Sequence, residues 1–318
     1  PLGCIYSVRA SLPMIKIRAW SRYESYRLSN QRLVEMKLDL HVHSTHSFDC
    51  LMTPARILRT AKKKGLNGVA ITDHDTLRGA LERARARICG DYDILMPLHE
   101  KTIVPISKHL DEFRRVTAVP LPEYEILEKC LDKRLTTSSA CRAGIPTPTS
   151  YFIDRLSQVR ELSETVKYPV VIKLRKEILT PPPRYRYAYS PADLVSGYDI
   201  MHRNCEFPLI QELVPGTGYG FFALMNERSE PLAVFCHKRL REYPITGGPS
   251  TYCESVYESR VHEYGLKILR EIGWTGVAMV EFKLDSRDGD FKLMEINPRF
   301  WGSLPLAIAS GVDFPYLL

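Results

Sequence analysis

The chain has 318 residues, of which 44% are hydrophobic and 25% are charged, a composition typical of a folded protein. No run approaches the roughly 18 apolar residues of a membrane span, and no repeat or low-complexity tract occurs, which argues against membrane-spanning, fibrous and mostly disordered classes. Lysine and arginine exceed the acids by 44 to 37, but residues 1–35 alone contribute +4 of this +7. The rest of the chain is too weakly basic to predict a nucleic-acid groove.

The eight cysteines form no CxxC pair, which argues against a zinc ribbon or a disulfide scaffold and favours a reduced, cytoplasmic setting. Residues 1–35 lack a clear apolar segment, so we expect a disordered extension, with a transit peptide as the alternative. Because the chain starts with Pro1 rather than Met, we expect it to be cut from a longer protein.

The pattern from residue 36 onward predicts a β-α-β-α-β unit with a parallel sheet covered by helices. The expected strands are 36–42, 66–72 and 91–97, and the expected helices are 54–64 and 77–88.

After a Pro-rich joint at 119–122 the order of elements becomes that of an α+β domain. The expected elements are a helix at 123–143, strands at 168–174 and 209–214, paired strands at 220–223 and 232–237, a helix at 259–272, and a hairpin of 277–284 with 291–297.

The hairpin at 276–303 is the most informative segment, because its register decides which side chains meet. A loop with an odd number of residues places Glu281 directly across from Glu295. The same register pairs the apolar residues Val280 with Ile296 and Phe282 with Met294, so one face of the hairpin is apolar and the other is polar. A two-residue turn would mix the faces, and we therefore expect the odd loop.

Asn297 falls on the same face as Glu281 and Glu295. Two carboxylates and an amide oxygen form the oxygen-rich ligand set that Mg²⁺ prefers, with Mn²⁺ as the alternative ion. Arg299 continues the alternation, where its guanidinium suits a phosphoryl group. The competing interpretation is a solvated hairpin face whose acids bind nothing.

Two lysines and one strand suggest a nucleotide-binding site. Lys133 follows Asp132 on the helix at 123–143, and Lys173 closes the apolar strand YPVVIK. The segment PLIQELVPG ends in a Pro-Gly bend that leaves backbone groups unpaired, which an adenine ring can use. Either Gln211 or Glu212 can accept from the exocyclic amine.

Lys133, Lys173, QELVPG, the glycine loop TGGPST (246–251) and VEF…MEINPR follow one another in this order. The ordered set resembles the ATP-grasp superfamily, and within it the branch of carbamoyl-phosphate-synthase-like, predicted carboxylate–amine ligases. The segment RFWGSLPLAIASGVDFP (299–315) adds to a resemblance that covers about 91–318.

The resemblance implies an ATP-grasp fold of two α+β subdomains that sandwich ATP. It implies an ATP- and Mg²⁺-dependent ligase of the EC 6.3 type, which converts a small carboxylate into an acyl phosphate for attack by an amine or similar nucleophile. The implied contacts are Lys133 and Lys173 to phosphates, Gln211, Glu212 and the backbone near Val214 to adenine, Glu281, Glu295 and Asn297 to Mg²⁺, and Arg299 to the transferring γ-phosphoryl group.

The lid departs from the family pattern, because no glycine occurs between Lys173 and Gly197. Prolines 181–183 remove backbone donors that would otherwise wrap the phosphates. Basic side chains are candidate replacements, namely Arg175, Lys176, Arg184 and Arg186. This puts turnover in question more than nucleotide binding.

A second resemblance lies upstream, where KLDLHVHSTHSFD and GVAITDHDT are similar to the opening of PHP (polymerase and histidinol phosphatase) phosphoesterases. His41 and His43 alternate onto one strand face, and Asp49 and His74 can join them in a second metal site. Because so short a segment cannot close a barrel, we expect a partial PHP module without phosphoesterase activity.

The expected domains are an extension (1–35), an α/β domain (36–120, with a PHP-like part at 36–88 and a part at 91–120 that resembles the domain preceding ATP-grasp), and the ATP-grasp domain (121–318). The alternative functions are a PHP-type phosphoesterase and a nucleotide-binding relic without catalysis. Neither the oligomeric state nor the two substrates can be predicted.

Overall fold

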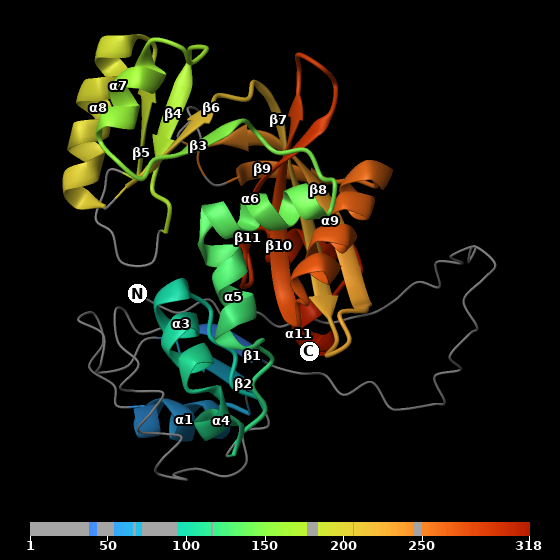
Figure 1. The fold of residues 1–318 in the computed structure, drawn as a ribbon. Helices are drawn as coiled ribbons and strands as arrows, with labels where there is room; N and C mark the ends of the chain where they lie inside the picture. Colours follow the sequence, from blue (N-terminus) through green and yellow to red (C-terminus); the bar gives the residue numbers. More distant parts are fainter. Residues whose placement is uncertain are drawn as a thin grey trace. The chain divides into compact units, whose positions relative to one another are not determined.

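The computed structural model describes residues 38–42, 54–65, 68–71, 94–115, 117–176, 184–205, 207–243, 248 and 250–318. The chain divides into two compact units, Pro1–Asp93 and Ile94–Leu318, which are described one at a time (Figure 1). The domain limits drawn from the sequence at residues 35 and 120 stay predictions.

The first unit contains a parallel pair of strands joined through a helix. Strand β1 (Leu38–Val42) pairs with β2 (Gly68–Ile71) in parallel, and α1 (Pro54–Lys63) lies between them in the sequence. Gly65, which has a φ of 68°, follows the end of the helix, as expected for a glycine stop. These three elements confirm the predicted start of the unit, whereas the helix expected at 77–88 lies outside the described residues.

The second unit begins with two helices that the sequence did not predict, α3 (Glu100–Lys108) and α4 (Leu110–Arg114). Pro105 lies inside α3 and weakens its helical signal. The strand expected at 91–97 is wrong in its described part, where Ile94 makes an isolated bridge to Ala118 and 95–98 have no regular structure.

The helix expected at 123–143 is in fact two helices, α5 (Tyr124–Leu131) and α6 (Lys133–Arg142). The break falls at Asp132, whose extended backbone ends α5 and whose carboxylate accepts a hydrogen bond from the Arg134 N–H at 2.9 Å. Asp132 is therefore the N-cap of α6. This cap places Lys133 at the first position of α6.

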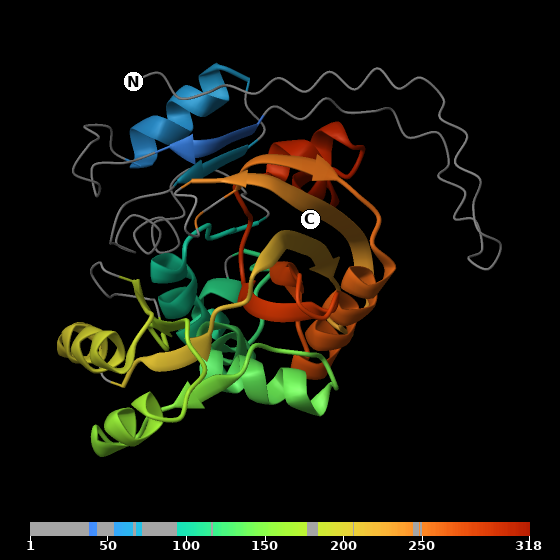
Figure 2. The ribbon, with the colours of Figure 1, turned by 90° about the horizontal axis from the view of Figure 1, so that it is seen from above.

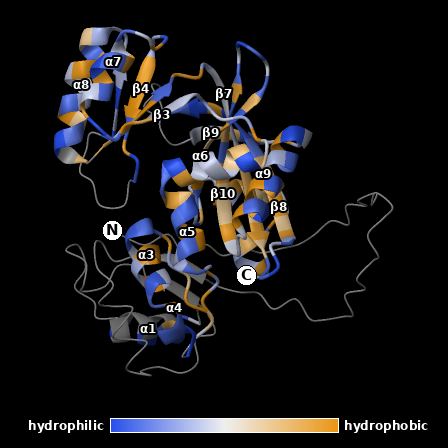
Figure 3. Ribbon diagram, viewed as in Figure 1, coloured by the Kyte–Doolittle hydropathy of each residue, from blue (hydrophilic) through white to orange (hydrophobic). Residues whose placement is uncertain are grey.

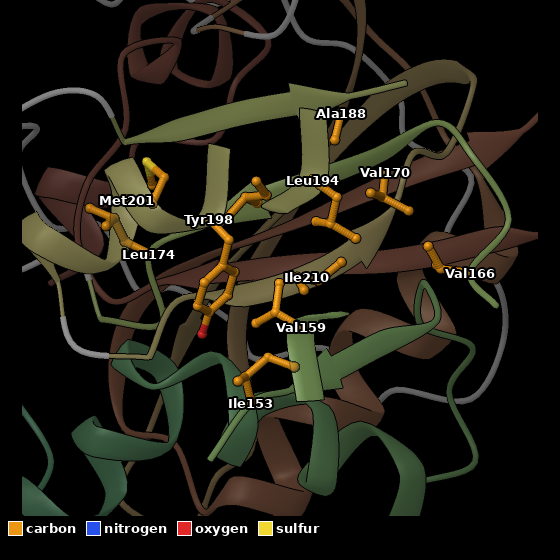
Figure 4. Packing of buried hydrophobic residues seen from close by; sticks show 11 residues of the cluster. Ile153, Val159, Val166, Val170, Leu174, Ala188, Leu194, Tyr198, Met201 and Ile210 are labelled. Atoms are coloured by element: carbon orange, nitrogen blue, oxygen red, sulfur yellow. The ribbon is translucent and has the colours of Figure 1, made fainter. Parts of the chain in front are cut away.

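The smaller sheet of this unit is antiparallel and has the order β3-β6-β4-β5. Its strands are β3 (Ser150–Phe152), β4 (Val170–Lys173), β5 (Tyr185–Ala188) and β6 (Leu209–Glu212). Helices α7 (Ser157–Ser163) and α8 (Pro191–Asn204) cover one face, and their apolar side chains close a core with the strands, including Tyr198 and Met201 of α8 (Figure 4).

The larger sheet is also antiparallel, with the order β11-β10-β7-β8-β9. Its long strands curve when viewed from above (Figure 2), and hydrophobic residues are concentrated along β10 (Figure 3). Its strands are β7 (Gly216–Met225), β8 (Pro231–Glu242), β9 (Ser250–Ser255), β10 (Gly276–Asp285) and β11 (Phe291–Asn297).

The two faces of the larger sheet differ in what covers them. Helix α9 (Ser259–Ile272) packs so closely on one face that a Cβ on its Gly265 would lie 2.2 Å from the Phe221 ring. On the opposite face, Phe222 and Trp301 join a core with α10 (Leu304–Ala309) and α11 (Phe314–Leu317). The remainder of this second face carries the polar residues of the predicted site.

None of the helices in the described ranges is both long enough and apolar enough to span a lipid bilayer.

Candidate active site

The β10–β11 hairpin places Glu281 directly opposite Glu295, as predicted. Val280 is opposite Ile296, also as predicted, but Phe282 pairs with Leu293 rather than Met294. Residues next to the turn follow an even-loop register, with Leu284 opposite Phe291, and an irregularity between Glu281 and Phe282 corrects it. A bulge that leaves Met294 without an opposite residue, not the turn, therefore aligns the two carboxylates.

Asn297 lies on the same face and connects the two acids. Its Nδ2 donates to Oε1 of Glu281 and to Oε1 of Glu295, both at 3.1 Å. All three side chains of the predicted metal set are thus brought together.

Arg239 of β8 reaches Glu281 across the intervening strand β7. Its Nη2 lies 2.5 Å from Oε2 of Glu281, and its side chain is only 12% exposed. The path is open because β7 carries glycine at two positions: a Cβ on Gly218 would lie 2.8 Å from Cδ of Arg239, and Gly220 is directly opposite Glu281. The sequence analysis did not place this residue beside the acids, although the alternation along β8 points it to the same face.

Burial and neighbouring charges shift the pKa values of the two acids in opposite directions. Burial, and next the neighbouring Glu295 carboxylate, raise the pKa of Glu281 to about 7, against the opposing effect of Arg239. Burial also acts to raise the pKa of Glu295, but Lys133, Asn297 and Lys173 outweigh it, so this pKa is lowered. Glu295 therefore lies within the field of both lysines predicted to contact phosphates.

Lys173 and Gln211 come together on the smaller sheet. Lys173 Nζ donates to Oε1 of Gln211 at 3.0 Å, and Gln211 Nε2 donates to the Ser150 hydroxyl at 2.9 Å. Both polar atoms of the Gln211 amide thus contact protein groups. The predicted contact of this amide with adenine stays a prediction.

Glu212 links the smaller sheet to the turn of the hairpin. Its Oε1 accepts from the Thr149 N–H at 2.8 Å, and its Oε2 pairs with Arg287 Nη2 at 3.0 Å. Arg287 also binds the fully buried Asp285. These contacts of Glu212 therefore connect the smaller sheet to the hairpin turn. The contacts of Glu212 and of the buried Val214 with adenine stay predictions.

Lys133 is positioned by a network of charges at the start of α6. The Lys133 N–H donates to the Arg175 carbonyl at 3.2 Å, and the Arg175 guanidinium binds both oxygens of the buried Asp132. Lys176 pairs with Glu128 at 2.8 Å. Two of the four basic residues suggested as phosphate ligands thus hold α5 and α6, and residues 177–183 of the lid lie outside the described residues.

Arg299 lies beside the acids and is held on two sides. Its Nε donates to Oε1 of Glu100 in α3 at 2.5 Å, and its Nη2 lies 3.4 Å from Oδ1 of Asn297. The predicted phosphoryl contact is therefore located next to the predicted metal set, and Glu100 is a partner that the sequence did not suggest.

His237 is a further buried residue on this face that the sequence analysis missed. It is directly opposite Gly220 in the row that contains Glu281, and its Nδ1 lies 3.0 Å from the Ser303 hydroxyl. Burial, with Arg239 as a second cause, lowers its pKa to about 4. In the part of the chain that the structure describes, its Nε2 and the Nε of Arg239 are among the few buried nitrogens without a hydrogen-bond partner.

The side chains present fit a divalent cation. Two half-buried carboxylates face each other and are held by N–H donors, from Arg239 on one acid and from Asn297 on both. Among the described residues no three His, Cys, Asp or Glu side chains form a metal-binding group. A site of two carboxylates and an amide matches Mg²⁺, which takes its other ligands from water and phosphate.

The second predicted metal site cannot be placed. His43, Asp49 and His74 lie outside the described residues, and only the backbone of His41, on β1, is described. Half of the loop TGGPST, residues 246, 247 and 249, also lies outside the described residues.

Two family models match the chain. The model for the PHP domain matches residues 39–94, and the model for ATP-grasp in the biosynthetic pathway with Ter operon matches residues 232–318. The second match contains β10, β11, Arg239 and Arg299.

The carbamoyl phosphate synthase large chain of Methanosphaerula palustris is 25% identical over 182 residues, which cover 52% of this chain and 16% of the relative. That of Kineococcus radiotolerans is 24% identical over 196 residues, covering 58% and 17%. The chain therefore spans about a sixth of the length of these relatives.

Solved structures share the fold at low sequence identity. The biotin carboxylase–beta-gamma-ATP complex from Campylobacter jejuni superimposes with a TM-score of 0.64 at 15% identity, covering 83% of this chain and 67% of that chain. D-alanine–D-alanine ligase from Bacillus anthracis gives 0.61 at 15% identity, covering 89% and 94%.

Proposed function

The chain combines the ATP-grasp fold with a segment at residues 39–94 that matches the PHP domain, and from this premise we propose that it is an ATP- and Mg²⁺-dependent ligase. It activates a small carboxylate as an acyl phosphate, which an amine or similar nucleophile then attacks. The observation that carries the proposal is the facing pair Glu281 and Glu295 within the field of Lys133 and Lys173. The structural neighbours include a biotin carboxylase–beta-gamma-ATP complex and a D-alanine–D-alanine ligase, and these support the same class.

The roles follow from charge and position. Glu281, Glu295 and the Asn297 oxygen would hold Mg²⁺, which when bound neutralises the charge of the phosphates. For this, the Asn297 amide must turn its oxygen toward the ion. Lys173, from the smaller sheet, and Lys133, from the start of α6, would hold the phosphates from the opposite side.

Arg299 would stabilise the phosphoryl group during transfer. Its Nε is held by Glu100, its Nη1 donates to the Phe300 carbonyl, and its Nη2 lies 3.4 Å from Oδ1 of Asn297. A guanidinium fixed in this way offers donors without reorganisation while charge moves from ATP to the carboxylate oxygen. The adenine site would lie near Gln211, Glu212 and the backbone of Val214.

Calorimetric titration with the ATP analogue AMPPNP in excess Mg²⁺ tests nucleotide binding. Glu295→Gln and Lys173→Met should each weaken binding by about tenfold or more, since each removes a charge-assisted contact. Glu254→Gln and Lys238→Met are matched controls, because Glu254 on β9 and Lys238 on β8 are 50% and 37% exposed and pair with each other at 3.9 Å. Equal binding by all four variants would contradict the site.

Phosphate release from ATP, measured with a panel of carboxylates and amines, tests the reaction class. The PHP match makes a phosphoesterase the second candidate, and hydrolysis of a phosphomonoester with Mn²⁺ or Zn²⁺ distinguishes it. If His41→Ala removes all activity while Glu295→Ala changes none, the ligase proposal is wrong.

A further inference from the structure

Arg239 occupies the position of a cation at one of the proposed metal ligands. Its guanidinium contacts Oε2 of Glu281 at 2.5 Å, and the Glu281 side chain is only 18% exposed. A divalent ion that binds Oε2 of this carboxylate must displace Arg239, because a metal cation and a guanidinium at the same oxygen repel each other.

Arg239 also contacts a second carboxylate, that of Glu242. Nη1 of Arg239 lies 3.5 Å from Oε1 of Glu242, which is on the same strand, three residues further along. Glu242 is 25% exposed and lies over Gly218, where its Oε1 would be 3.1 Å from a Cβ. Arg239 can therefore leave Glu281 without becoming an unpaired buried charge, which would be costly.

The present contacts leave part of the guanidinium unused. In the described part of the chain, the buried Nε of Arg239 has no hydrogen-bond partner, and an unmade buried hydrogen bond is unfavourable. Glycine at 218 leaves out a side chain whose Cβ would lie 2.8 Å from Cδ of Arg239. These features describe a side chain with two carboxylate partners and room to move between them.

We infer that Arg239 is an exchangeable counter-ion of the metal site, which neutralises Glu281 when no metal is bound and moves to Glu242 when a divalent cation binds. The inference rests on the proposed function for the identity of the metal ligands. Through this exchange, the protein avoids facing carboxylates without a cation and sets how strongly it binds the metal in the absence of nucleotide.

The exchange predicts effects of opposite sign for the two partners of the arginine. Arg239→Met removes the competitor, so Mn²⁺ should bind about tenfold more tightly, the effect of one close charge–charge coupling. Glu242→Gln removes the partner to which the displaced arginine moves, so Mn²⁺ should bind about threefold or more weakly. A purely structural role for both residues would change Mn²⁺ binding in the same direction.

Mn²⁺ binding to the full chain without nucleotide, measured by electron paramagnetic resonance of the free ion, tests the inference. Arg241→Met on the same strand is the matched control, because Arg241 is exposed, and it should bind Mn²⁺ as the wild type does. Circular dichroism establishes that each variant is folded, and the rise of its melting temperature with Mn²⁺ gives a second measure of affinity.

Arg239→Met binding that is unchanged or weaker overturns the inference, as does Glu242→Gln binding that is unchanged or tighter. If Arg239→Met does not fold without metal, Arg239→Lys, which keeps the charge on a shorter side chain, is used in its place. The rise of its melting temperature with Mn²⁺ should exceed that of the wild type. Failure of the proposed function is recognised separately, because AMPPNP then fails to bind the wild type whatever the Mn²⁺ results show.

Discussion

His237 should make the protein less stable in mild acid. Its imidazole is 1% exposed, and burial lowers its pKa from 6.5 to about 4. Between pH 6.5 and 4 the imidazole is protonated in the unfolded chain but stays neutral in the folded protein. The free energy of unfolding therefore falls as the pH decreases over this range. At 1.36 kcal/mol for each unit, the loss is roughly 3 kcal/mol.

His237→Gln removes this proton uptake and keeps a polar group near the Ser303 hydroxyl. We expect the variant to be less stable than wild type at pH 7, since it alters a buried site, but to lose about 3 kcal/mol less on acidification to pH 4. Urea unfolding at a series of pH values, followed by tryptophan fluorescence, measures both quantities. Trp301 is well placed to report, because it stacks on Phe222, which contacts His237.

Other groups that titrate in this range, such as His262, whose pKa is also lowered by burial, are present in both proteins. They therefore cancel when the two curves are subtracted. His109→Gln, at an exposed imidazole, is the control for the loss of a histidine at the surface. A constant difference between wild type and His237→Gln from pH 7 to pH 4 would refute the reasoning.

Two substitutions test the packing that supports the site. Gly265→Ala should destabilise the protein by about 1–3 kcal/mol or more, because the new Cβ would lie 2.2 Å from the fully buried Phe221 ring; Gly302→Ala, where nothing lies within 4 Å, should be neutral in the same thermal unfolding experiment. Arg287→Met should cost about 3 kcal/mol by leaving the buried Asp285 without its guanidinium. Lys292→Met, which breaks a pair with the half-exposed Asp288, should cost less than about 1 kcal/mol, and equal losses in the two variants would contradict this account of the turn.

The sequence predicted the elements with strong local signals. The helix at 259–272 matches α9 residue for residue, and Glu281 does face Glu295. The helix break at Asp132 was missed because the apolar pattern continues across it. What interrupts the helix is the cap and the bond to Arg175, a residue 43 positions away that no local pattern connects to Asp132.

The sequence grouped the acids of the candidate site and also named Lys133, Lys173 and Arg299, but it did not predict the contact of Arg239 with Glu281. Glu281, Glu295 and Asn297 lie on one hairpin, so strand alternation is enough to group them. Arg239 reaches Glu281 from a strand that is not adjacent to β10. That contact depends on strand order and on glycines in β7, which become informative only when the sheet is known.

The bulge at Met294 has a consequence for how this hairpin can change over time. Since the alignment of Glu281 with Glu295 is set beyond the bulge, the turn at 285–290, between Leu284 and Phe291, is uncoupled from it. Insertion or deletion of a residue in the turn can be absorbed by gaining or losing that one extra residue, while the chemistry upstream is preserved. Homologous chains should therefore vary in turn length far more freely than in the spacing from Glu295 to Arg299.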